Sequence, residues 1–300
     1  MCVRDEGETL AAAIESVLPV VDEVVLGVDE SSTDDTLEIA RRYATAGKLF
    51  TFQWEDDFSA ARNQVIQRAS GDIILILDGH EFCPDDNHPT AGYLARMRQQ
   101  DPAANRIMTP LSFMAQVREQ GIPHGFDVIC ITLAMNPDEA GIQQLFFLQP
   151  RLFYRGEIHY VSAVHNYLGG HTRDQAMGCP EGLLVHQMPA KRESRRKVQR
   201  KKMNVSGLRK DAAIERAKPK ADRVGRPWFY LGNTYSDMGA PLKALPHYLE
   251  YLKWSKFGEE RRQALQQVAV IYFRHWASNM PETTDEEKQA KKAARADGRL

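Results

Sequence analysis

The chain has 300 residues, 43% of them hydrophobic, and a formal net charge of −1. This length fits about two domains, and the apolar content is enough for a packed core. No apolar run approaches the roughly eighteen residues of a membrane-spanning helix, and the first residues lack a signal-peptide pattern. The four cysteines lie far apart without a CxxC pair, which argues against a zinc knuckle and a disulfide framework. We therefore expect a soluble, cytoplasmic protein without membrane insertion.

The net charge conceals two parts of opposite sign. Residues 191–300 carry 26 Lys and Arg against 13 Asp and Glu, whereas residues 1–190 carry 13 and 27. Such asymmetry indicates separate modules with different partners. We expect one domain over 1–190 and a second over 191–300.

Strands and helices are expected to alternate over the first 77 residues. Apolar runs predict strands at 1–3, 24–28, 49–54 and 72–77, and helical periodicity predicts helices at 9–18, 37–43 and 58–69. This alternation is typical of a Rossmann-like α/β domain with a mostly parallel sheet. In such sheets ligands bind beyond the carboxyl ends of the strands.

The run at 72–81 ends its strand in Asp78, Gly79, His80 and Glu81. Asp78 and His80 lie on the same side of an extended chain, so both can reach one cation. The alternative is an ordinary acidic loop after a core strand.

Four motifs in chain order resemble the family 2 glycosyltransferases of GT-A fold, over roughly residues 1–190. They are Arg4-Asp5-Glu6, Asp29-Glu-Ser-Ser-Thr-Asp-Asp-Thr36, Trp54-Glu-Asp-Asp-Phe-Ser-Ala-Ala-Arg-Asn63 and Leu77-Asp-Gly-His-Glu81. The resemblance implies transfer of a hexose from a nucleotide-sugar, a UDP-sugar above all, by inverting displacement.

The resemblance also implies roles for residues at the strand ends. Asp29 would bind the base, and Arg62 and Asn63 would lie near the nucleotide. Arginine suits a diphosphate because it is always charged and donates in a planar fork; the alternative for Arg62 is an ion pair on a helix surface. Arg4, Glu6, Asp78 and Gly79 are further donor-site candidates.

The metal motif departs from the family, whose members usually have Asp-x-Asp. Imidazole also ligates Mn²⁺, although it suits Mg²⁺ less well, and Asp-x-His occurs in the polypeptide N-acetylgalactosaminyltransferases. The candidate ligands of Mn²⁺ (or Mg²⁺) are Asp78, His80, Glu81 and His165. Which of His80 and Glu81 holds the metal stays open.

The stretch from residue 87 to 166 is less regular. We expect a helix containing Tyr93, Leu94 and Met97, and strands at 106–113 and 127–133. Residues 149–166 are similar to a late family motif, an Arg-Leu-Phe strand before Val-His-Glu, with Asn166 in place of the glutamate. An inverting transfer needs a carboxylate base for the acceptor. The candidates are Asp127, Asp138, Glu139 and Glu157, with Asp127 preferred.

The second module begins with a basic helix and continues with a repeat pattern. Its cations between 191 and 202 fit either a solvated linker helix or a surface for nucleic acid. Trp228-x-x-Leu231-Gly232-x-x-Tyr235, followed by Ala244 and Tyr248, matches the tetratricopeptide pattern. One repeat cannot bury its own face, so it must stack on the basic helix, on residues 261–276 or on another subunit.

Two functions remain open on the sequence alone. The first is a glycosyltransferase acting on a macromolecular acceptor: a peptide or protein, a cytoplasmic glycan precursor, or a hydroxymethylated base in DNA. The second is a non-catalytic scaffold with a degenerate metal site, whose basic helical domain binds protein or nucleic acid.

Overall fold

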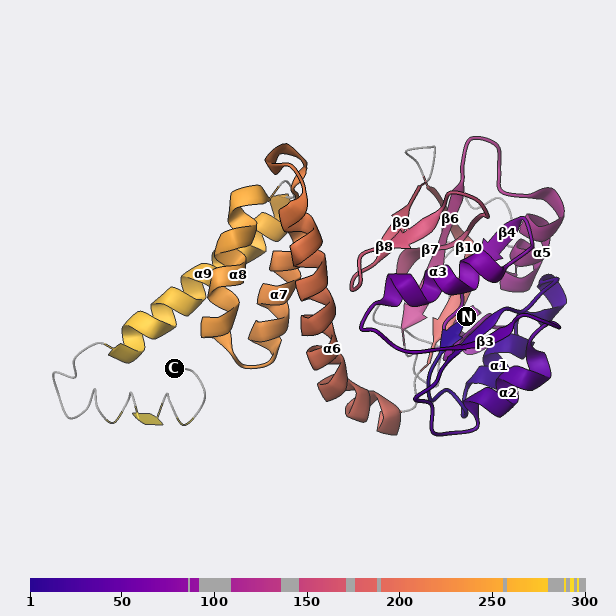
Figure 1. Cartoon of the computed structure of the whole chain (residues 1–300), viewed down its shortest axis with the longest axis horizontal. Coiled ribbons are helices and arrows are strands. Elements are labelled where there is room, and N and C mark those ends of the chain that lie inside the picture. Colours follow the sequence, from indigo (N-terminus) through magenta and orange to yellow (C-terminus); the bar gives the residue numbers. More distant parts are fainter. Residues whose placement is uncertain are drawn as a thin grey trace. The chain divides into compact units, whose positions relative to one another are not determined.

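The computed structural model describes residues 1–85, 87–91, 109–135, 146–170, 176–187, 190–255 and 258–279, with four isolated residues beyond them (Figure 1). Its internal contacts divide the chain into two compact units, Met1–Arg195 and Arg196–Leu300. No helix within the described ranges is both long and apolar enough to cross a membrane. An α/β domain followed by an all-helical region is thereby confirmed.

The first unit begins with a three-stranded parallel sheet. Its strands are β1 (Cys2–Val3), β2 (Leu26–Asp29) and β3 (Leu49–Phe52), in the order β1-β2-β3. The helices α1 (Leu10–Glu15), α2 (Thr36–Tyr43) and α3 (Phe58–Arg68) alternate with them, and a 3₁₀ turn spans Leu18–Val20. The apolar faces of α1 and α2 form one core with β1 and β2. The predicted alternation is confirmed.

A five-stranded sheet completes this unit. It consists of β4 (Ile73–Leu75), β7 (Phe146–Tyr154), β6 (Val128–Met135), β10 (Met177–His186) and β5 (Glu81–Phe82), in the order β4-β7-β6-β10-β5. Only β6 and β10 pair in parallel among these, so this sheet is mixed. A hairpin of β8 (His159–Val161) and β9 (Tyr167–Gly169) packs beside α3.

One predicted strand is wrong and another is confirmed. The strand expected at 127–133 is β6. The described part of the strand expected at 106–113 instead starts α5 (Pro110–Gln120), because Thr109 caps the backbone N–H of Ser112 at 3.1 Å and Pro110 occupies the first turn. The helix expected around Tyr93, Leu94 and Met97 lies outside the described residues.

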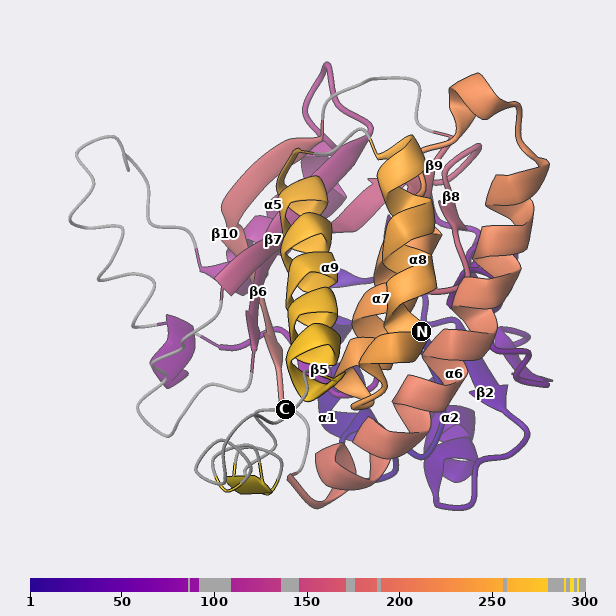
Figure 2. The same cartoon turned by 90° about the vertical axis from the view of Figure 1, so that its left-hand side faces the viewer.

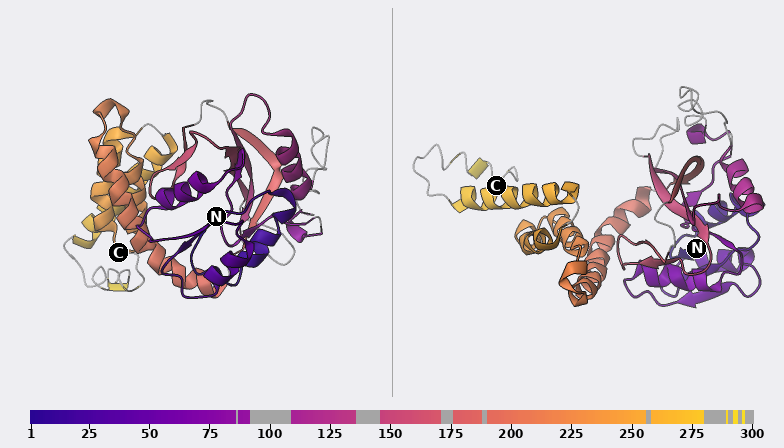
Figure 3. Two further views of the ribbon diagram at one scale, coloured as in Figure 1. Left: turned by 45° about the vertical axis from the view of Figure 1, so that its right-hand side comes forward. Right: turned by 90° about the horizontal axis from the view of Figure 1, so that it is seen from above.

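The second unit is helical throughout its described part. It contains α6 (Ala190–Ala217), a 3₁₀ turn (Lys220–Asp222), α7 (Arg226–Asp237), α8 (Pro241–Trp254) and α9 (Gly258–Asn279). The signature residues do what the repeat pattern predicts: Tyr248 is fully buried against Gly232, and α8 packs on α7 (Figure 2). The helix α9, yellow in Figure 3, packs in turn on α8.

Candidate functional site

The loop after β1 ties three strand ends together. The backbone N–H of Glu6 donates to Thr36 Oγ1 at the start of α2, and its buried carboxylate lies 3.1 Å from His80 Nδ1 after β4. A Cβ on Gly79 would meet Glu6 Cγ at 2.6 Å, so only glycine allows this approach. The carboxyl ends of β1, β2 and β4 therefore meet at one edge.

Asp29, the last residue of β2, is 2% exposed. Its Oδ1 accepts hydrogen bonds from the backbone N–H and the hydroxyl of Ser31, both at 2.9 Å. Its Oδ2 lies 3.6 Å from Arg4 Nη1 but accepts no hydrogen bond from the residues that the structure describes. A buried carboxylate oxygen without a hydrogen-bond donor favours a ligand that supplies an N–H or O–H group.

A pocket of about 330 Å³ lies at the ends of β2 and β3. Glu30, Phe52, Trp54 and Gln64 are among its lining residues. The Trp54 ring is fixed by an edge contact with Phe58 at 4.7 Å and by its Nε1, which donates to Asp56 Oδ1 at 2.9 Å. The pocket is of the size that small ligands occupy.

Arg62 on α3 faces the tip of β4. Its Nη2 donates to both carboxylate oxygens of Asp78, at 3.0 and 3.3 Å, and its Nη1 donates to Asn166 Oδ1 at 2.8 Å. Its guanidinium also lies over the Tyr160 ring, 5.0 Å from the centroid. Burial alone would raise the pKa of Asp78, but the charges of Arg62 and Arg151 outweigh it and hold that pKa well below its usual range.

Two buried N–H groups of Arg62 and Asn166 are not used in these contacts. Arg62 Nε and Asn166 Nδ2 have no hydrogen-bond partner within the described part of the chain. Asn166 is the departure from the family motif noted in the sequence, where no role was assigned to it. The structure gives it one, because it orients Arg62 across 104 residues of sequence.

Asn63, expected near the nucleotide, is turned elsewhere. Its Nδ2 donates to the backbone carbonyl of Tyr160 at 2.9 Å, and its Oδ1 accepts from the Tyr160 backbone N–H at 2.8 Å. Both ends of the amide therefore hold β8 against α3, and the nucleotide role expected for Asn63 stays a prediction.

Glu81 is 1% exposed, and its carboxylate contacts the residues at the tip of β4. Its Oε2 accepts from the Asp78 backbone N–H at 3.0 Å, and its Oε1 forms a buried ion pair with Arg151 at 2.6 Å. The ring of His186 lies 3.7 Å from the same Oε1 and makes an edge contact with His80. Protein groups therefore engage both carboxylate oxygens of Glu81, as Arg62 engages both of Asp78.

Arg151 and His186 were not among the expected site residues. An arginine between the apolar neighbours of β7 is a signal that could have found the first, since a buried guanidinium requires a carboxylate partner. His186 carries no comparable signal, because its place depends on the pairing of β10 with β5.

The remaining candidates come from elements other than the tip of β4. His165 is exposed and precedes Asn166 at the tip of the β8–β9 hairpin. Asp127 pairs with Tyr154 opposite the start of β4, roughly 15 Å along the strand from Asp78, and exposed Glu157 lies beyond the same end. The base role expected of Asp127 or Glu157 stays a prediction. Asp138 and Glu139 fall outside the described residues, and no group of three metal-ligating side chains occurs inside them.

Comparison with known proteins gives the N-terminal part a family. Residues 1–96 match the glycosyl transferase family 2 model. The chain is 27% identical over 95 residues to the SPbeta prophage-derived glycosyltransferase SunS of Bacillus subtilis, which covers 32% of this chain and 22% of SunS. It is 48% identical over 81 residues to a TPR repeat-containing protein of Synechococcus elongatus, covering 27% and 19%. The matches thus span about a fifth of the length of these relatives.

Two solved structures show a distant likeness. One is a mannosyltransferase from Pyrobaculum calidifontis in complex with GDP-Man and Mn²⁺, with a TM-score of 0.38 and 14% identity over 92% of this chain and 81% of that one. The other is TarS of S. aureus in complex with UDP-GlcNAc, with a TM-score of 0.35 and 12% identity over 90% and 78%. On the sequence match, residues 1–96 are similar to family 2 glycosyl transferase domains, and the chain continues into a tetratricopeptide-like helical region.

Proposed function

We propose that this chain binds a UDP-sugar at the shared edge of β1, β2 and β4 and transfers its hexose to a macromolecular acceptor by inverting displacement. The observation that carries the proposal is the buried Oδ2 of Asp29, which lacks a hydrogen-bond donor among the described residues; the next residue, Glu30, lines a pocket large enough for a ring. A uracil ring presents an N–H that can satisfy this oxygen. The family match of residues 1–96 supports the same reading.

The diphosphate fits the neighbourhood of Arg62. An anionic oxygen there satisfies Arg62 Nε and Asn166 Nδ2, two buried donors with no acceptor among the described residues. The fixed charge of Arg62 then stabilises negative charge that develops on the leaving group.

Asp78 and His80 fit a divalent cation. Glu6 holds His80 Nδ1, a carboxylate–histidine arrangement that orients the other ring nitrogen toward a metal, and the pKa of Asp78 keeps it ionised. Glu81 fits less well, because its side chain is 1% exposed and paired with Arg151, whereas the Asp78 side chain is 27% exposed beside Arg62. Bound Mn²⁺ would supply further neutralisation of the diphosphate.

The acceptor is assigned to the helical region. The packed α7–α8 repeat favours a peptide or protein, since tetratricopeptide pairs stack into extended binding surfaces. The side chains of residues 190–200, which would favour DNA, lie outside the described set. A hydroxymethylated DNA base is therefore the second acceptor to test, and its binding should weaken steeply with salt.

Mass spectrometry of peptide and hydroxymethylated DNA acceptors, incubated with a panel of nucleotide sugars and Mn²⁺, tests the proposal. We expect a hexose mass added with a UDP-sugar, lost in Asp78→Asn and kept in Glu157→Gln, the exposed acid at the far end. A chain that modifies no acceptor, hydrolyses no UDP-sugar and is not stabilised by UDP would be the scaffold instead.

A further inference from the structure

Both oxygens of the Asp78 carboxylate accept from one cation, the guanidinium of Arg62. The distances from Arg62 Nη2 are 3.0 Å to Oδ1 and 3.3 Å to Oδ2. The Asp78 side chain is 27% exposed and that of Arg62 is 17% exposed, so solvent screens this ion pair only in part. A divalent cation bound by Asp78 would stand next to the guanidinium and be repelled by it. Arg62 therefore neutralises the carboxylate of the proposed cation site as long as no donor is bound.

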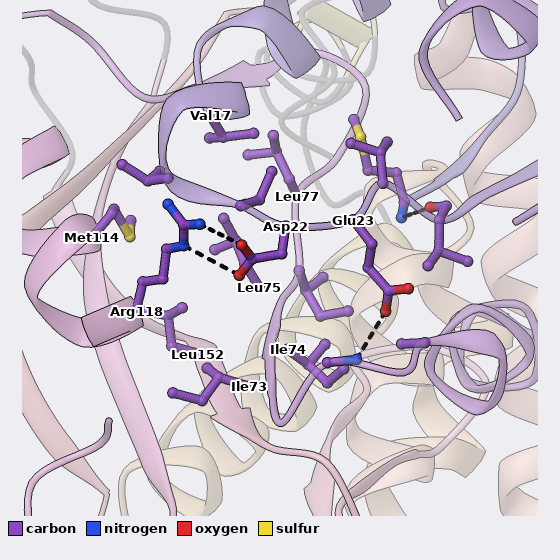
Figure 4. Close-up of a pocket in the computed structure, with 18 of the residues that line it drawn as sticks. Val17, Asp22, Glu23, Ile73, Ile74, Leu75, Leu77, Met114, Arg118 and Leu152 are labelled. Atoms are coloured by element: carbon purple, nitrogen blue, oxygen red, sulfur yellow. Dashed lines mark hydrogen bonds and ion pairs between the residues drawn. The ribbon is translucent and has the colours of Figure 1, made fainter. Parts of the chain in front are cut away.

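The Asp78 end of this ion pair is fixed by the backbone. The Asp78 N–H donates to Glu81 Oε2 at 3.0 Å, and the Asp78 carbonyl accepts from the Glu81 N–H at 3.0 Å. Leu77, the residue before it, is buried in an apolar core with Val17 and Leu152, which Figure 4 draws around an aliphatic pocket. The tip of β4 therefore holds its carboxylate in place when a ligand arrives.

Arg62 is the partner that can change its contacts, because its guanidinium ends a long side chain with several rotatable bonds. The guanidinium lies over the Tyr160 ring, where a planar cation can turn and keep that contact. Besides Asp78 it contacts Asn166, whose Oδ1 accepts from Nη1 at 2.8 Å. Arg62 Nε and Asn166 Nδ2 are buried N–H groups without an acceptor in the described part of the chain. An anionic oxygen that accepts from both would draw the guanidinium away from Asp78.

We propose that Arg62 exchanges ion-pair partners: it holds Asp78 in the free protein and passes to the diphosphate of the donor, which frees Asp78 for the divalent cation. This exchange rests on the proposed donor site. A carboxylate released from a guanidinium supplies the oxygen ligand that Mn²⁺ prefers. Each ligand then raises the affinity for the other by the same factor, because coupling between two sites is reciprocal.

A direct bond between the cation and UDP would couple the two ligands as well, so coupling alone does not identify the exchange. The exchange differs in what Arg62 does without nucleotide. If Arg62 occupies Asp78, its removal must strengthen Mn²⁺ binding and weaken UDP binding in one and the same variant. A guanidinium that contributed only to the diphosphate site would change UDP binding alone.

Two binding measurements on the full chain test this difference. Electron paramagnetic resonance of unbound Mn²⁺ gives the cation affinity without nucleotide, and calorimetric titration in EDTA gives the UDP affinity without metal. Compared with the wild type, Arg62→Gln should bind Mn²⁺ at least about tenfold more tightly and UDP at least about tenfold more weakly. Arg68→Gln removes the same charge from an exposed position of α3, so both affinities should change by less than about twofold.

Asn166→Asp tests the exchange with the arginine in place, and its nearly identical shape guards against a folding defect. Its carboxylate keeps an acceptor for Arg62 Nη1 and imitates the bound anion, so Mn²⁺ affinity without nucleotide should again rise at least about tenfold. Gln67→Glu adds the same charge at an exposed position of α3 as the control.

Unchanged Mn²⁺ affinity in either folded variant, with UDP binding by the wild type intact, would overturn the exchange and leave the proposed donor site standing. A wild type that binds no UDP would instead refute the proposed function, and the exchange with it.

Discussion

Arg62 and Asn63 are neighbours on α3 with different tasks. Arg62 contacts Asp78 and Asn166, while both ends of the Asn63 amide bind the backbone of Tyr160. The sequence could pair them as a nucleotide motif, because adjacent residues in a known motif share a setting. The sequence could not show that the Asn63 amide is hydrogen-bonded to the backbone of Tyr160, which lies 97 positions away in the chain.

Asn63→Ala should therefore lower stability without weakening the donor site directly. Two buried backbone groups of Tyr160 lose their partners, which costs about 2–3 kcal/mol. Urea unfolding measures the loss, with the exposed Gln67→Ala on the same helix as a control within about 0.5 kcal/mol. A large loss of UDP affinity at unchanged stability would show that Asn63 contacts the nucleotide after all.

Glu23 makes a second residue-scale prediction. Burial would raise its pKa, but hydrogen bonds from Ser70 and Gly71, with Lys48, lower it to about 2. Because the folded pKa is below the ordinary value of 4.5, this stabilisation is complete above pH 4.5 and is lost as the pH falls toward 2. Glu23→Gln should cost about 1–2 kcal/mol at pH 7, allowing for solvent screening.

The pH dependence distinguishes the stabilisation by the ionised Glu23 carboxylate from an effect of side-chain packing. The difference in urea midpoint between the wild type and Glu23→Gln should shrink steadily from pH 4.5 to pH 2. A difference that stays constant over this range would contradict the lowered pKa.

At the scale of elements, sequence patterns predicted the helices and strands that depend on interactions between neighbouring residues. The alternation through β4 and the α7–α8 pair followed from apolar spacing, because each element buries one face. The pattern failed at 106–113, where the Thr109 cap and Pro110 start a helix although the run is apolar enough for a strand. The sequence pattern also could not predict which strands pair. The pairing of β5 with β10 brings Glu81 to His186, and it joins segments that are far apart in the chain.

The contact of Gly232 with Tyr248 makes the element-scale prediction. An alanine Cβ at 232 would lie 2.5 Å from the Tyr248 ring, so Gly232→Ala should push α7 from α8 and cost about 1–3 kcal/mol. Gly258→Ala is the matched control, because nothing lies within 4 Å of its added Cβ. Thermal unfolding by circular dichroism compares the two. Equal or increased stability of Gly232→Ala would contradict this packing.

At the scale of the whole molecule, an acidic α/β unit and a basic helical unit share one chain. The first gathers the buried carboxylate of Asp29, the Arg62–Asp78 ion pair and the Glu6–His80 contact at one edge. The sequence placed Asp29, Arg62 and Asp78 at that edge. Asp29 and Asp78 lie at the ends of apolar strand runs, and Arg62 belongs to the motif of the following helix. It did not predict the supports, Asn166, Arg151 and His186, since these join the edge only through tertiary pairing.

The central claim is that this edge binds the nucleotide of a UDP-sugar through Asp29. Isothermal titration of UDP with Mn²⁺ into the wild type and Asp29→Asn tests it most directly, because asparagine keeps an oxygen for Ser31 and replaces Oδ2, the proposed acceptor of the uracil N–H, with an amino group. We expect wild-type binding and a loss of affinity of about tenfold or more in the variant, as for a charge-assisted hydrogen bond. Equal affinity in the two proteins, or no binding of UDP by the wild type, would contradict the account.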